Sequence, residues 1–234
     1  MKVAMAFTPA LISTVLFFQG AAFNSAELQK ARDLQDRGAL ERIASQFSEA
    51  AKKQANDVQA QYRLALAQSY LAEIAMETGD KNRAKAAAEV GIAAAEKATA
   101  LKGDSAEYHR ILGTLCGQAI PANVLTGLKY GHCAQDEVNK AVQMDPKASV
   151  NYVSRGVGNY YLPAAMGGGV DAAIKDFQKA IELDAKSAEA HLWLGIALHK
   201  ANRTAEAHKE LQTAVQLNPG RIWAKQQLAK TPEK

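Results

Sequence analysis

A fixed spacing of small residues and leucines recurs along this chain, and it is clearest in residues 188–219. There Gly195 is followed after twelve residues by Ala207, and then by Leu211 and Pro219. A small residue on each of two helices lets the helices cross closely, and a proline ends the second helix because it lacks the backbone N–H. The spacing therefore predicts a helical hairpin that is repeated along the chain.

Two earlier copies of the pattern carry extra residues between their helices. Gly156 and Ala173 are 17 residues apart, and Gly113 and Ala134 are 21 apart, where the clearest copy has 12. The paired helices of these two copies are thus joined by longer segments than the standard hairpin needs.

The two inserts differ in composition. The shorter one lies in residues 162–169, where a proline and three glycines cannot continue a helix. The longer one includes Ile120, Pro121 and Gly127. We expect both to form enlarged connections between helices on one edge of the stack.

The upstream part of the chain also reads as helical hairpins. Residues 58–77 and 81–100 are predicted to form two long helices around a short turn. Residues 26–37 and 39–54 match the repeat weakly and are predicted to form a first hairpin with its break at Gly38.

These patterns predict an all-α fold, an α-solenoid wound as a right-handed superhelix of helical hairpins. The expected organisation is a signal peptide at 1–22, a divergent N-terminal hairpin at 23–56, a repeat solenoid at 57–221 with units at about 60–105, 106–148, 149–187 and 188–221, and a C-terminal capping helix and tail at 222–234.

The first residues have the pattern of an export signal. Lys2 supplies a positive charge, residues 3–18 are uncharged and mostly apolar, and the small residues Gly20, Ala21 and Ala22 follow. Pro9 and the shortness of the apolar run argue against a stable membrane-spanning helix. We expect cleavage near Ala22, no lipid attachment, no membrane insertion afterwards, and a periplasmic or secreted mature protein.

The combination of Leu194, Gly195, Ala207 and Pro219, with its poorer copies over residues 60–219, resembles the tetratricopeptide repeat family. The tract 160–174 is also similar to exported bacterial repeat proteins that carry a Pro-x-x-x-Gly-Gly loop. Some of those resemble the periplasmic repeat subunit associated with tripartite substrate-binding transporters. The resemblance implies a non-enzymatic bacterial protein with a protein partner.

In tetratricopeptide stacks, defined positions of each first helix line the concave groove. Because several of these positions hold aliphatic or aromatic residues here, the resemblance implies a groove suited to a protein or peptide segment. Packing within the stack is an equally good interpretation of Tyr160 and Tyr161. The predicted partner-binding residues are Arg110, Thr114, Gln118, Val153, Val157, Tyr160, Tyr161, Leu192, Trp193, Ile196, His199 and Lys200.

Arg155 falls where the repeat normally places a buried leucine. A buried arginine must find a carboxylate or carbonyl partners, and a local shift of the helix is the simpler explanation. The carboxylates of Asp136, Glu137 and Asp176 lie among lysines at helical spacing and are expected to face solvent.

Cys116 and Cys133 are the two cysteines of the chain. In an exported protein such a pair favours a disulfide, and the repeat spacing places the two residues on facing helices. A zinc site that combines them with His109 and His132 matches none of the familiar ligand spacings, so we expect no metal and no cofactor.

No motif for catalysis emerges from the sequence: Gly167 to Gly169 lack the Lys-Ser/Thr of a phosphate loop, and no nucleophile elbow is present. The net charge of +4 is mild and its basic residues are dispersed, which argues against nucleic acid. The sequence predicts an exported scaffold that binds a protein or peptide. The alternative is a periplasmic transport component that holds an apolar small molecule between the enlarged hairpins.

Overall fold

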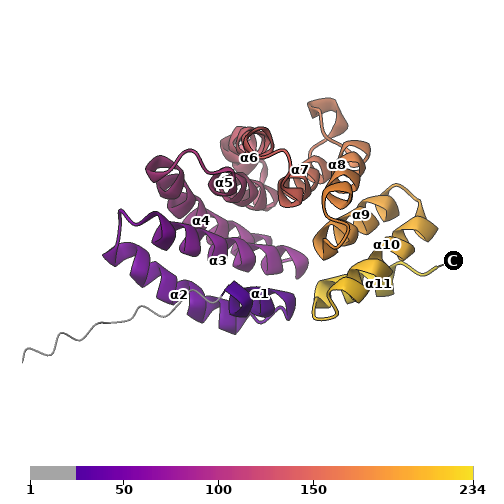
Figure 1. The fold of residues 1–234 in the computed structure, drawn as a ribbon, viewed down its shortest axis with the longest axis horizontal. Helices are drawn as coiled ribbons and strands as arrows, with labels where there is room; N and C mark the ends of the chain where they lie inside the picture. Colours follow the sequence, from indigo (N-terminus) through magenta and orange to yellow (C-terminus); the bar gives the residue numbers. More distant parts are fainter. Residues whose placement is uncertain (1–24, 234) are drawn as a thin grey trace, which may run out of the picture.

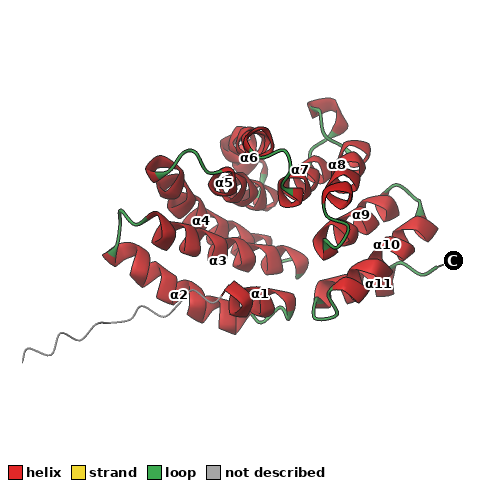
Figure 2. Ribbon diagram, in the orientation of Figure 1, coloured by secondary structure: helices red, strands yellow, loops and turns green. Residues whose placement is uncertain are grey.

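The structure, a computed structural model, describes residues 25–233. Within this range the chain forms helices joined by short turns, and we find no strand among these residues. The helices pair in chain order and follow one another round an arch (Figures 1 and 2). The all-α solenoid prediction is confirmed.

The helices are α1 (Ser25–Asp33), α2 (Arg37–Lys53), α3 (Val58–Glu77), α4 (Lys81–Leu101), α5 (Ala106–Ala119), α6 (Val124–Met144), α7 (Ser149–Tyr161), α8 (Val170–Leu183), α9 (Ala188–Lys200), α10 (Thr204–Leu217) and α11 (Ile222–Lys230), with short 3-10 helices η1 (Ile120–Ala122) and η2 (Ala164–Met166).

Polar side-chain caps fix where five of these helices, α2, α3, α4, α6 and α9, begin. The carboxylate of Asp57 accepts from the backbone N–H of Gln59 at the start of α3, and that of Asp80 accepts from Arg83 at the start of α4. Each cap supplies an acceptor that the first helical turn lacks. The predicted helices 58–77 and 81–100 are confirmed, the second to within one residue.

The break in the first hairpin is not at Gly38, where the sequence analysis placed it. The carboxylate of Asp36 caps α2 by accepting from Ala39 at 2.9 Å, and Gln35 turns the chain with a φ of 51°. Gly38 lies inside the first turn of α2. A strong cap decided the boundary here, because a single glycine within a helix is only mildly unfavourable.

The two inserts have different structures. Residues 162–169 form the predicted loop, in which Gly169 has a φ of 102° that a side chain would strain. The prediction of a second enlarged connection is wrong, because η1 is short and α6 begins at Val124 and runs through Gly127. Asn123 and Thr126 form a capping box that starts α6 early and turns the extra residues into helix.

Close helix crossings use the glycines of the repeat. A Cβ atom on Gly195 would lie 2.6 Å from Cγ of Leu211, and one on Gly113 would lie 2.8 Å from the backbone nitrogen of Val138. Both distances are below van der Waals contact. These two glycines therefore let α9 approach α10 and α5 approach α6.

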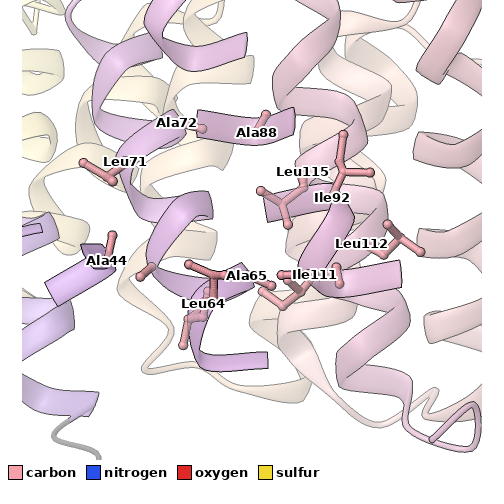
Figure 3. Close-up of a cluster of buried hydrophobic side chains, with 14 of the residues drawn as sticks. Ala44, Leu64, Ala65, Leu71, Ala72, Ala88, Ile92, Ile111, Leu112 and Leu115 are labelled. Carbon is pink, nitrogen blue, oxygen red and sulfur yellow. The ribbon is translucent and has the colours of Figure 1, made fainter. Parts of the chain in front are cut away.

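The buried apolar side chains form two clusters. The first is contributed by α1 to α6, from Leu28 to Tyr130, and part of it is shown in Figure 3. The second is contributed by α7 to α11, from Val153 to Ala224. The chain passes from one cluster's helices to the other's through residues 145–148.

The end of the stack is covered by α11, which buries Trp223 and Ala224 against the second cluster, as the predicted capping helix requires. Within the described part of the chain, the helices lack the combined length and hydropathy that crossing a membrane demands. The predicted signal peptide at 1–22 lies outside the described residues.

Candidate protein-interaction surface

Aromatic side chains of α7, α8, α9 and α11 form one group. The ring of Trp193 lies 5.9 Å from that of Tyr160, 6.3 Å from that of Tyr161, 6.2 Å from that of Phe177 and 5.1 Å from that of Trp223, measured between centroids. Such tilted and offset contacts stabilise a packed aromatic group. Trp193 is buried at its centre, whereas Tyr161 at its edge is 52% exposed.

The predicted groove residues on α7 and α9 differ in their exposure to solvent. Leu192 is 1% exposed and Val153 is also buried, so neither is available to a partner and their assignment to the binding surface is wrong. Both are members of the second apolar cluster. The indole of Trp193 is likewise mainly a packing element.

The accessible members of the predicted set are Val157, Tyr160, Tyr161, Ile196, His199 and Lys200, which are half-buried or exposed. The ammonium of Lys200 lies 4.1 Å from the centroid of the Tyr160 ring and donates to the Tyr160 carbonyl at 3.3 Å. This surface therefore offers ring faces, short apolar side chains and a positive charge. We call these six residues the aromatic patch.

The predicted residues on α5 are engaged with neighbouring helices. Arg110 donates twice to the carboxylate of Glu107, at 2.7 Å each, and a third N–H reaches Ser154 on α7. Thr114 donates to the same Ser154 hydroxyl, and Gln118 exchanges hydrogen bonds with Ser69 on α3. These side chains tie α3, α5 and α7 together.

Arg155 has the carboxylate partner that a buried arginine needs. Its guanidinium donates to Asp176 of α8, with the shortest N–O distance at 2.6 Å, and Asn159 donates to the other oxygen at 2.8 Å. Asp176 is 6% exposed, so the prediction that it faces solvent is wrong. No helix shift is needed, because two donors of α7 satisfy the buried carboxylate.

Histidines on α5 and α9 make equivalent contacts. Nδ1 of His109 lies 2.5 Å from Glu137, and Nδ1 of His191 lies 2.6 Å from Glu210, each across its own hairpin. Glu137 is thus paired instead of freely solvated. Among the described residues, we find no group of three or more His, Cys, Asp or Glu placed to hold a metal ion.

Cys116 of α5 and Cys133 of α6 are joined in a disulfide, with Cα atoms 5.9 Å apart. Cys116 is a buried member of the first apolar cluster, and Cys133 packs against it. The bridge links the two helices of the hairpin whose second helix is lengthened.

A buried ionic network, which the sequence did not predict, joins the two ends of the arch. Arg221, just before α11, is 1% exposed. Its guanidinium contacts Glu73 at 2.7 Å, Glu189 at 3.0 Å and also Glu77. The turn before α11 is thereby tied to both α3 and α9 through this one side chain.

Arg32 of α1 is the second cation of this network. It pairs with Asp33 at 2.6 Å and Glu189 at 3.1 Å, and its guanidinium carbon lies 5.1 Å from the centroid of the Tyr70 ring. We call Arg32, Asp33, Glu73, Glu77, Glu189 and Arg221 the end-joining network. Its members are up to 189 residues apart in the chain, so helical spacing gave no signal of their contact.

The carboxylates of the network differ in acidity. Burial raises the pKa of Glu73 to about 7, against the opposing effect of Arg32 and Arg221. Burial also raises the pKa of Glu77. Burial acts in the same direction on Glu189, but there the two arginines outweigh it and the pKa is lowered.

The phenols of Tyr161 and Tyr62 stay protonated. Burial raises the pKa of Tyr161 to about 12, and burial together with the neighbouring Glu107 raises the pKa of Tyr62 further above its ordinary value. Tyr62 donates to Glu107 at 2.7 Å. At neutral pH these hydroxyls act as hydrogen-bond donors and acceptors.

The hairpin stack, its glycine crossings and its capping helix define a tetratricopeptide-type repeat protein. Models of a TPR repeat and of the tetratricopeptide repeat match residues 167–202 and 188–221. A family model described as regulator of microtubule dynamics protein 1-3 matches residues 27–163, more than half of the chain. The chain belongs to this family.

Two solved structures share the fold. A thermophilic TPR protein of Thermus thermophilus is 18% identical, with a TM-score of 0.63 over 88% of this chain and 97% of its own. The HusA haemophore from Porphyromonas gingivalis is 21% identical, with a TM-score of 0.59 over 78% of this chain and 96% of its own. A search of curated proteins finds no match.

Proposed function

We propose that this protein is an exported, non-enzymatic adaptor that binds a protein or peptide segment on its concave face. The aromatic patch carries the proposal, because Tyr161 is 52% exposed while Trp193 and Phe177 hold its surroundings rigid. A fixed aromatic side chain gives contact area at little entropic cost, and such residues supply much of the energy of protein interfaces.

Lys200 and His199 extend this surface with polar character. Both are exposed at the end of α9, and Lys200 is held over Tyr160. A segment with an apolar side chain for the tyrosines and a carboxylate for Lys200 would complement the patch. Proteins of this repeat class are generally scaffolds, which agrees with an interaction role.

Export is supported by two separate features. Residues 1–22 have the charge and apolar pattern of a signal peptide, and the cysteine pair forms a disulfide, which persists in oxidising compartments. We propose a bacterial periplasmic or secreted location on this basis. The proposal also rests on the loop at 162–169, which is similar to that of exported repeat proteins, including those associated with tripartite transporters.

The family description names regulation of microtubule dynamics for the proteins it covers. It supports an interaction role for this chain and leaves the partner open. The transport alternative requires an apolar cavity bordered by residues 120–127 and 162–169. Two surface recesses, of about 310 and 370 Å³, lie beside α1 and between α2, α3 and α4, and residues 120–127 and 162–169 line neither of them.

The test is affinity capture from an extract of the protein's own cellular compartment, with wild type and a Tyr161→Ala variant as baits. The matched control is Leu101→Ala, which removes an exposed apolar side chain from the outer helix α4. We expect a partner that is retained by wild type and the control and lost from Tyr161→Ala. Equal recovery of every captured protein on all three baits would contradict the assignment of the patch.

A further inference from the structure

The two apolar clusters divide the molecule into two halves. Helices α1 to α6 pack on one cluster and α7 to α11 on the other. Along the chain the halves are joined by residues 145–148, and beside this connection Arg110 and Thr114 of α5 contact Ser154 of α7. The connection therefore has the position of a hinge.

The opposite side of the arch is closed by polar contacts. Besides the end-joining network, Asn218 donates to Asp33 at 2.9 Å and Gln226 donates to Gln35 at 3.2 Å. A surface recess of about 310 Å³, open to solvent, lies beside this junction and is lined in part by Leu34 and Gly220. Figure 1 shows the α1 and α11 ends next to each other there. The junction is thus held by charge and hydrogen bonds.

Such a contact can open more readily than an apolar one. Burying ions removes their hydration, and this loss offsets much of the attraction between them. Opening the network returns Arg221 and its carboxylates to water, which hydrates them favourably. Separating two apolar faces would instead expose apolar surface to water, which is unfavourable. In addition, four carboxylates surround two guanidiniums, so the closed network has an excess of acidic groups.

We propose that the end-joining network is a latch that holds the two halves closed about the 145–148 hinge, and that its opening admits a partner to the concave face. While closed, the network ties α1 and α3 to α9 and to the turn before α11. The claim about partner access rests on the proposed function. The latch itself does not.

Solution X-ray scattering of the full protein tests the latch. The Arg221→Gln variant removes the central cation, and Arg203→Gln is the matched control, because Arg203 forms an exposed pair with Glu206 at the start of α10. Arg221→Lys keeps the charge without the branched guanidinium. We expect Arg221→Gln to raise the radius of gyration by about 1 Å or more, Arg221→Lys to raise it less, and Arg203→Gln to leave it unchanged.

Circular dichroism of each variant separates opening from unfolding. If Arg221→Gln loses helicity, Glu189→Gln replaces it, since the amide keeps the shape of the side chain while removing the carboxylate that pairs with both Arg32 and Arg221. Helical variants Arg221→Gln or Glu189→Gln that scatter as wild type would overturn the latch. A variant that expands but captures no more partner than wild type keeps the latch and contradicts its link to the proposed function.

Discussion

At the scale of single residues, the glycines at helix crossings set how closely paired helices pack. Gly195 faces Leu211 and the carbonyl of Ala207, with no room for a methyl group. This role was predictable from sequence, because the spacing of small residues along the hairpin follows directly from its geometry.

We predict that Gly195→Ala lowers the free energy of unfolding by about 1–3 kcal/mol, because the added Cβ overpacks the α9–α10 crossing. Gly158→Ala is the control, since a Cβ there meets no atom within 4 Å and alanine favours helix. Chemical denaturation measures both. A Gly195→Ala protein as stable as wild type would show that the crossing has room to relax.

Other features at the scale of single residues could not be predicted from the sequence. The position of Arg155 indicated that it needs a partner, but Asp176 is 21 residues away on another helix and resembled its solvent-facing neighbours. Leu192 occupied a groove position of the repeat and lies in the core. Repeat spacing identifies a position on a helix, and only packing decides whether that position meets solvent or another helix.

At the scale of helices and hairpins, local signals predicted α3 and α4 well. Both helices begin at an aspartate cap and are separated by the turn at Gly79, whose φ is 80°. The start of α6 was missed, because its capping box of Asn123 and Thr126 is an Asn/Thr variant of the usual Ser/Thr and Glu pair. The insert therefore looked like a loop.

The disulfide belongs to this scale, since it joins α5 to α6. Closing a loop of 17 residues restricts the unfolded chain, and we predict that Cys116→Ser with Cys133→Ser lowers the free energy of unfolding by about 3 kcal/mol. Peptide mapping of the unreduced protein should recover the two cysteines in one linked species. Two alkylatable thiols in oxidised, folded protein would contradict the bridge.

At the scale of the whole molecule, the end-joining network couples stability to pH. Glu73 has a pKa of about 7 when folded and an ordinary, lower value when unfolded, so the folded protein takes up a proton first as pH falls. The stabilisation of the folded state by protonation of Glu73 is largest near and below the pKa that Glu73 has in the unfolded chain. It is lost as pH rises through about 7. The groups that face Glu73 are Arg32 of α1, Tyr70 and Glu77 of α3, Glu189 of α9 and Arg221.

We predict a higher melting temperature at about pH 5.5 than at about pH 8, and a smaller difference in Glu73→Gln. His191 contributes in the same direction, because its hydrogen bond to Glu210 raises its pKa and favours the folded state at lower pH. For this reason the comparison with Glu73→Gln, measured by calorimetry, isolates the network. An unchanged pH difference in that variant would assign the effect to other groups.

The closed arch itself was not predictable from the repeats. Each hairpin contacts its neighbours, and the curvature that brings Arg221 to Glu73, 148 residues earlier, accumulates over the whole stack. Small changes in the angle at which neighbouring helices cross therefore decide whether the two ends of the arch meet.

The central claim is that a partner binds the concave face at the aromatic patch. Hydrogen–deuterium exchange, measured on the protein with and without the partner captured by wild type, tests it most directly. We predict slower exchange in the second halves of α7 and α9, which carry Tyr161 and Lys200. Slower exchange confined to the outer helices α8 and α10 would contradict the claim.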